Sequence, residues 1–281
     1  MNILRAQSNT GLSDNDIHRV APSVFATEPW EGVSDAYAFI PTATIVSEMR
    51  NAGLVPVSAQ QSVVRISGKR DYAKHMLRFR RQQDVDAFPR VVNGNQHHFY
   101  TEQPTIAEVV LTNSHDRSSA FNLAAGLFRL VCSNGLMISA STLDSIRVRH
   151  VGAGGGEVIE GAYRIVDEFP VVMQQVEQWQ HQSLTDRQQL AFATAAATLR
   201  WDDHAPVRPQ QLLAARRDVD DKPDLWTTFN RVQENMAKGG LRGRTQTNKR
   251  MTTRGINSVT EDTKLNKALW TLAEELSKSV N

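Results

Sequence analysis

The chain concentrates its structural information in VVLTNSHDRSS, residues 109–119. An apolar run enters a polar cluster there, and the apolar stretch that follows ends at an Asn-Gly pair. Polar side chains between strand-like segments indicate a loop held by a sheet, and Asn-Gly is typical of a hairpin turn. We expect the polar groups to bond to the backbone and to one another. This structural motif comprises Asn113, Ser114, His115, Asp116, Asn134 and Gly135.

The same stretch does not read as a catalytic centre. Ser114, His115 and Asp116 are adjacent, and neighbours on an extended chain point to alternate sides, so they cannot converge as a triad. An enzyme that uses His115, Asp116 and Cys132 stays open as a third alternative, although a lone Cys in an apolar strand is typical of packing.

Metal and nucleotide motifs are missing from the sequence. His97, His98, His115 and Asp116 lack HxxxH or CxxC spacing, so we expect no metal site. The chain has no GxxxxGK[ST] loop, and residues 154–156 do not fit GxGxxG. We therefore expect no cofactor and no ATPase.

Strand-like patterns fill the first half of the chain. Alternating or apolar runs predict strands at 54–57, 62–67, 75–80, 106–111, 121–132 and 144–151, with one helix at 41–51 and a loosely held lead-in at 1–23. Near residue 155 the apolar period changes from 2 to 3.6. The prediction is an α+β protein: an N-terminal antiparallel sheet with a packed helix in residues 1–152, then a mostly helical part in residues 153–281.

Composition bounds the setting of the protein. The 281 residues are 40% hydrophobic and 22% charged, with a net charge of +2. The single Cys132 excludes an internal disulfide, and a reducing cytoplasm is the simplest compartment. The N-terminus lacks the apolar core of a signal peptide, and no apolar run approaches the ~20 residues that span a bilayer. We expect a cytoplasmic protein without membrane contact.

Two segments are markedly basic. Alternation at 75–80 places Arg78 and Arg80 opposite Leu77 and Phe79, either on a solvated sheet face or in a phosphate-contacting stripe. Residues 238–254 hold six Lys or Arg and no acid, which predicts a basic mobile arm. With rings for stacking, the candidate nucleic-acid-binding residues are Lys69, Arg70, Tyr72, Lys74, Arg78, Phe79, Arg80, Arg81, Arg129, Arg242, Arg244, Lys249, Arg250 and Arg254.

A family resemblance rests on four segments. Residues 111–116 (LTNSHD), 128–136 (FRLVCSNGL), 74–80 (KHMLRFR) and 265–270 (LNKALW) resemble a large uncharacterised family of phage- and plasmid-like proteins carried by prophages and conjugative elements. The resemblance covers roughly residues 30 to 275. Where the family usually has Gly after the Asp, this chain has Arg117. The resemblance implies a mobile-element setting, in which recombination and anti-defence proteins are frequent.

These observations give two functional hypotheses of different class. The first is an ATP-independent protein that binds and anneals single-stranded DNA, or RNA, as a homo-oligomer in recombination. Its expected outline is similar to that of single-strand annealing proteins of the RecT and Red-beta type, an analogy at the level of the fold. The second is a protein-protein interaction factor that counters a host defence system.

Overall fold

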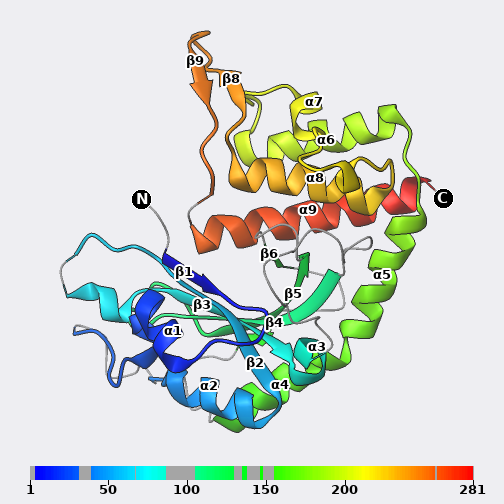
Figure 1. The fold of residues 1–281 in the computed structure, drawn as a ribbon. Coiled ribbons are helices and arrows are strands. Elements are labelled where there is room, and N and C mark those ends of the chain that lie inside the picture. Colours follow the sequence, from blue (N-terminus) through cyan, green and yellow to red (C-terminus); the bar gives the residue numbers. More distant parts are fainter. Residues whose placement is uncertain are drawn as a thin grey trace, which may run out of the picture. The chain divides into compact units, whose positions relative to one another are not determined.

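The computed structural model describes residues 4–31, 39–66, 68–86, 105–129, 135–137, 146–147, 155–256 and 258–280. The chain forms two compact units. Unit 1 contains Met1–Val131 and Leu143–Phe169, and unit 2 contains Cys132–Thr142 and Pro170–Asn281. The α+β prediction is confirmed: strands dominate the N-terminal part and helices the C-terminal part (Figure 1). The helix that follows the predicted division at 152/153 belongs to unit 1 with the sheet.

An antiparallel sheet forms the centre of unit 1. Its strands follow the chain in the order β1 (Leu4–Gln7), β2 (Leu54–Gln61), β3 (His75–Arg81), β4 (Thr105–Asn113) and β5 (Asn122–Arg129). The two-residue β7 (Ile146–Arg147) pairs with β5. β2 and β3 pair over most of their length, with one register shift between Pro56 and Ser58. Because Pro56 has no N–H to donate, the shift occurs where the ladder loses a donor.

Several strand predictions were right in place but not in extent. Residues 62–66, predicted as a strand, form the connection after β2, and the single strand β2 occupies residues 54–61. Residues 4–23, the described part of the predicted loose lead-in, are instead structured. They supply β1 and α1 (Asp14–Val20), whose capping box pairs Ser13 with Asp16. A side-chain cap of this kind satisfies backbone N–H groups that the first helical turn leaves unpaired.

Helices cover the sheet of unit 1. α2 (Thr42–Asn51), predicted from Pro41 and its apolar spacing, packs on β2, and its Ile45, Val46 and Met49 are buried. α4 (Gly155–Asp167) contacts α2, β4 and β5. Two short 3-10 turns, η1 (Pro22–Phe25) and η2 (Lys69–Tyr72), contact each other, and α3 (Gln82–Asp86) follows β3.

Unit 2 is helical around an aromatic core. It contains β6 (Gly135–Met137), α5 (Phe169–His181), α6 (Asp186–Trp201), α7 (Pro209–Leu212), η3 (Asp218–Asp220), α8 (Leu225–Lys238) and α9 (Val259–Val280). α6, α8 and α9 contact one another (Figure 1). Trp179 packs 4.5 Å from Trp270, and Trp226 stacks on Phe229 at 5.6 Å. Rings of this size dominate the burial energy of a core.

Residues 238–254 depart most from expectation. They were predicted to be a mobile arm, but β8 (Arg242–Arg244) and β9 (Arg250–Thr252) form an antiparallel hairpin, which we call the basic hairpin.

Across the described ranges, no helix is both long and apolar enough to cross a lipid bilayer.

Candidate nucleic-acid interface

The motif at residues 113–116 is part of a buried hydrogen-bond network in unit 1. Thr42 Oγ1 lies at its centre, 3.0 Å from Asn113 Nδ2, 3.0 Å from His75 Nε2 and 3.3 Å from His115 Nε2. Asn113 Oδ1 accepts the Ser114 N–H at 2.8 Å. These side chains are fully buried. The polar groups of the motif therefore bond to the backbone and to one another, as polar groups in a core must.

His75 is held in its neutral form within this network. Burial, and then the nearby His115, lower the pKa of His75 from 6.5 to about 3. Its Nδ1 lies 3.1 Å from the Ala73 carbonyl and 2.8 Å from Ser23 Oγ. Since a carbonyl only accepts, Nδ1 carries the proton. It cannot then take a proton from Ser23, so this pair does not form a nucleophile and base.

The rest of the motif closes the loop after β4. Ser114 Oγ accepts the Ser119 N–H at 2.8 Å, and Asp116 accepts the Ser118 N–H at 2.9 Å. The Lys69 ammonium lies 3.2 Å from Asp116. Burial alone would raise the pKa of Asp116, but the bonds from Ser118 and the Lys69 charge outweigh it and lower this pKa. Arg117 has φ +63°, a conformation that favours the glycine usual in the family at this position.

The described residues of this region do not form a catalytic arrangement around His115. His115 is fully buried, and Cys132, like His97 and His98, lies outside the described residues. Within the described ranges, no three His, Cys, Asp or Glu side chains gather as a metal site requires.

The predicted basic stripe on β3 is not on the surface, and this expectation was wrong. Arg78 and Arg80 are each 2% exposed and Phe79 is fully buried. Arg80 Nε donates to the buried Glu108 at 3.0 Å, and Arg78 Nε lies 3.5 Å from the same carboxylate. The register of β3 with β4 pairs Phe79 with Val109, which brings Glu108 beside Arg80. Buried charges require such partners, so Arg78 and Arg80 cannot bind phosphate. The buried Phe79 cannot stack on a base.

The other candidate nucleic-acid-binding residues near β3 do not form a continuous basic surface. Arg81 forms an ion pair with Asp84 at 2.6 Å, and Tyr72 packs edge-on against Trp30 at 5.2 Å. Lys74 is half-buried, and burial lowers its pKa. Arg70 is exposed. The Arg129 side chain and Asn134 lie outside what the structure describes, and Gly135 begins β6.

The basic hairpin presents its cations to solvent. Arg242, Arg244, Arg250 and Thr252 alternate with half-buried Gly243 and Met251, so the four share one exposed face. Arg244 pairs directly with Arg250 across the strands. Like charges in that position destabilise a hairpin by a few tenths to about 1 kcal/mol. Lys249 and Arg254, also exposed, extend the basic surface.

The turn of the hairpin is closed by its own polar residues. Thr245 N donates to the Lys249 carbonyl at 2.9 Å, and Asn248 N donates to the Thr245 carbonyl at 2.8 Å. Asn248 has φ +61°, which Asn tolerates better than most residues. Arg244 Nη1 donates to the Asn248 carbonyl at 3.1 Å. Polar groups of the turn therefore order it, although the segment has too little apolar area to form a core of its own.

The connection between α6 and α7, together with α7 itself, supports the inner side of the hairpin. Arg244 N donates to the Pro206 carbonyl at 2.8 Å, and Gln211 Nε2 donates to the Arg242 carbonyl at 2.9 Å. A Cβ added at Gly243 would lie 2.1 Å from the Pro206 oxygen and 3.1 Å from Val207. Only glycine allows this approach.

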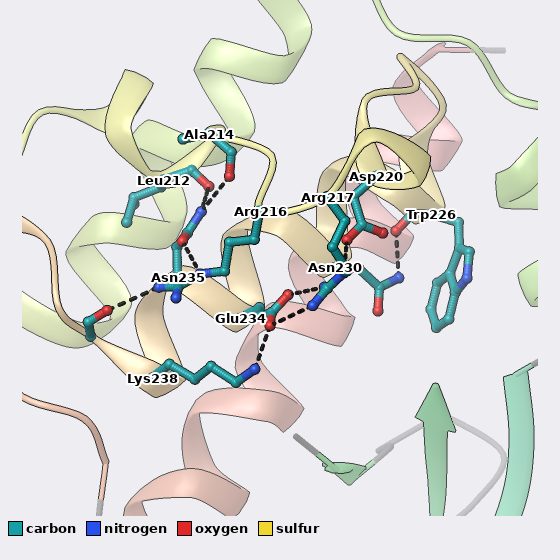
Figure 2. Close-up of polar contacts among 11 residues, drawn as sticks. Leu212, Ala214, Arg216, Arg217, Asp220, Trp226, Asn230, Glu234, Asn235 and Lys238 are labelled. Atoms are coloured by element: carbon teal, nitrogen blue, oxygen red, sulfur yellow. Dashed lines mark hydrogen bonds and ion pairs between the residues drawn. The ribbon is translucent and has the colours of Figure 1, made fainter. Parts of the chain in front are cut away.

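A polar network fixes the end of α8 from which the hairpin emerges. Figure 2 shows Asn235 between Arg216 and the carbonyls of Leu212 and Ala214. Arg216 Nη2 also donates to the Gly239 carbonyl at 2.9 Å. The hairpin therefore starts from a fixed point, as a precise binding element requires.

A second group of polar contacts at this end of α8 is centred on Glu234, the residue before Asn235. Glu234 is contacted by both Arg217 and Lys238, with Lys238 Nζ 2.6 Å away (Figure 2). Burial would raise the pKa of Glu234, but these two partners lower it. The carboxylate stays ionised and binds Lys238, so this lysine of the basic segment is solvent-exposed but already paired with an acid.

Residues next to the hairpin that the sequence interpretation missed are Arg200 and Trp201. Arg200 donates to the Arg254 carbonyl at the base of the hairpin, and its guanidinium lies 4.8 Å from the centre of the Trp201 ring. Trp201 is partly exposed at the end of α6. The position of Trp201 in an Ala-rich helix gave no signal in the sequence, because the contact of its neighbour Arg200 with Arg254 arises only from tertiary packing.

Comparison with known proteins finds relatives over most of the chain. The family model described as "Domain of unknown function (DUF932)" matches residues 29–270. The UPF0380 protein YafZ of Escherichia coli (strain K12) is 40% identical over 266 residues, covering 94% of this chain and 91% of the relative. The UPF0380 protein YfjQ of the same strain is 39% identical, with the same coverage. No solved structure matches.

Proposed function

The chain belongs to the DUF932 family, and we propose that it binds single-stranded nucleic acid without ATP through the basic hairpin. The observation that carries the proposal is the exposed face of Arg242, Arg244 and Arg250. The direct Arg244–Arg250 pair costs stability in the free protein. A phosphate placed between the two guanidinium groups would convert this repulsion into two charge-assisted hydrogen bonds.

Trp201 supports a preference for single strands. Binders of single strands combine a cationic track with rings on which unpaired bases stack, and each stacked base contributes ~1–3 kcal/mol. The predicted rings were Tyr72 and Phe79, and Phe79 is buried. Trp201, linked to the hairpin through Arg200, takes this role in the proposal. Bases paired in a duplex present no such face.

The wider setting follows from the sequence. The absence of a phosphate-binding loop motif favours binding without ATP hydrolysis. The family resemblance supports a mobile-element setting and a role in recombination, where strand annealing by a homo-oligomer would bring two strands together. In this proposal the protein acts in the cytoplasm.

Fluorescence anisotropy with labelled oligonucleotides tests the proposal. We expect single-stranded DNA or RNA to bind more tightly than duplex of the same length. Five phosphate contacts from the exposed cations of the hairpin, at about 0.7 each, give a slope of log K against log salt of about −3.5. No binding at low salt would overturn the proposal. A protein partner captured from nuclease-treated host lysate would then favour the interaction factor that counters a host defence.

Replacing Trp201 separates strand preference from charge. Trp201→Leu should weaken single-strand binding about tenfold and leave duplex binding unchanged, since it removes one stacking ring. Tyr163→Leu, at an exposed ring of unit 1, is the matched control. An equal loss for single strands and duplex would assign the affinity to charge alone.

A further inference from the structure

A pocket of about 440 Å³ lies between η1 and η2 in unit 1, and no role proposed above uses it. We call it the η1–η2 pocket. Its volume falls within the range of about 300–1,000 Å³ that small-molecule sites occupy. The side chains that give it chemical character are His18, Arg19, Phe25, Arg70 and Asp71. It stands on residues separate from the basic hairpin and does not depend on nucleic-acid binding there.

One buried side chain fixes both sides of this pocket. The Gln61 carbonyl oxygen accepts from Ser23 N at 3.0 Å and from Ser23 Oγ at 2.6 Å, which holds η1. The Gln61 amide nitrogen donates to the Arg70 carbonyl at 2.7 Å, which holds η2. Gln61 is 5% exposed. Because these bonds join η1 and η2 within the fold, the spacing of the two turns is set before any ligand arrives.

The network beneath the pocket reinforces that spacing. Ser23 is also 2.8 Å from His75 Nδ1, and His75 reaches Thr42 on α2. A wholly buried network of this kind specifies one arrangement, since each unpaired member would cost free energy. The motif that identifies the family thus supports a preorganised surface feature.

The lining combines planar rings with cations. The His18 and Phe25 rings lie 5.4 Å apart at 53°. Arg70 is exposed at the opposite turn, and Arg19 is only loosely engaged by Asp16, at 3.4 Å. Guanidinium groups recognise phosphate, and aromatic rings accept a flat heterocycle. The Asp71 carboxylate adds an acceptor for an amino or hydroxyl group.

We propose that the η1–η2 pocket binds a nucleoside monophosphate, with Arg19 and Arg70 on the phosphate and the ring pair against the base. The ligand would be a free nucleotide or the phosphorylated end of a strand, which share this chemistry. An anion without a ring would use only half of the lining.

Isothermal titration calorimetry of the full chain tests the proposal with four nucleoside 5′-monophosphates. We expect saturable binding at one site per chain for at least one of them. Ribose 5-phosphate and adenosine, which each carry half of the chemistry, should bind at least about tenfold more weakly. Comparing a trinucleotide with and without a 5′-phosphate tells strand ends from free nucleotides: phosphate-dependent binding of the trinucleotide assigns the ligand to strand ends.

Variants at exposed positions locate the site without disturbing the core. Arg70→Ala should weaken nucleotide binding about tenfold or more, because it removes a charged hydrogen-bond donor. Arg65→Ala, at an exposed arginine outside the lining, should leave binding unchanged. No nucleotide binding at millimolar concentration, equal binding by ribose 5-phosphate, or equal effects of the two variants would each overturn the proposal. None of these results depends on the basic hairpin.

Discussion

The neutral His75 makes unit 1 sensitive to acid, and the size of the effect follows from its pKa of about 3 in the folded chain. An unfolded histidine titrates near 6.5. Between these two values the unfolded chain binds a proton that the folded chain refuses, so the free energy of unfolding falls as the pH falls. The stability is present above pH 6.5 and is lost progressively toward pH 3.

The magnitude can be worked out for a convenient pair of conditions. Each pH unit below 6.5 removes about 1.4 kcal/mol for one histidine of this kind. From pH 7 to pH 5 the contribution of His75 therefore amounts to about 2 kcal/mol. His75→Asn keeps a donor toward the Ala73 carbonyl but cannot take up a proton. The variant should be less stable than the wild type at pH 7 and should lose about 2 kcal/mol less on acidification.

Unit 1 must be followed separately from unit 2. Urea unfolding at pH 7 and pH 5, with a hydrogen-exchange pulse at one fixed pH, reports on peptides from β3 and β4 alone. His204→Asn, at an exposed histidine, serves as control and should keep the acid loss of the wild type. An acid loss that is the same in His75→Asn and in the wild type would refute the reasoning, because the proton would then be taken up elsewhere.

Three further substitutions test individual contacts. Arg117→Gly should raise the unfolding free energy of unit 1 by about 1 kcal/mol, because φ +63° strains a side chain; Arg117→Ala should show no such gain in urea unfolding. Glu108→Ala should lower the same free energy by about 3–5 kcal/mol, since it leaves Arg78 and Arg80 buried without this carboxylate; a loss below 1 kcal/mol would contradict that pairing. Gly243→Ala should speed amide exchange across residues 242–252 and weaken oligonucleotide binding, because its Cβ would lie 2.1 Å from the Pro206 oxygen; unchanged exchange would show that the hairpin does not rest there.

The sequence predicted the strands of unit 1 better than their surroundings. Alternation at residues 75–80 places the strand correctly, yet the same pattern fits a solvated face and a buried one. The difference depends on Glu108, a charged residue within an apolar run whose pairing with Arg80 appears only in the register of β3 and β4. The N-terminal elements were missed because Ser13 and Asp16 form their capping box within an otherwise polar stretch.

In the candidate site, too, the features set by local sequence were predictable, and those set by distant residues were not. The basic character of residues 238–254 is plain in the sequence, and so is their low apolar content, which is limited to Leu241 and Met251. Their order as a hairpin depends on Pro206 and Gln211, which lie more than 25 residues earlier. The resemblance to an uncharacterised family was confirmed by the match over residues 29–270, and the mobile-element setting stays a prediction. The noted departure at Arg117 coincides with a left-handed residue.

The central claim is that the basic hairpin contacts the phosphates. The most direct test is the salt dependence of oligonucleotide binding by a variant whose hairpin arginines are replaced. Arg242→Gln, Arg244→Gln and Arg250→Gln, combined in one chain, should make the slope of log K against log salt less negative by about 2, which corresponds to three lost phosphate contacts. The control carries the same charge change at exposed sites elsewhere in unit 2, as Arg187→Gln, Lys222→Gln and Lys278→Gln. The proposal predicts a wild-type slope for the control. Equal changes of slope in the two variants would contradict it, because the affinity would then reflect net charge and not the hairpin.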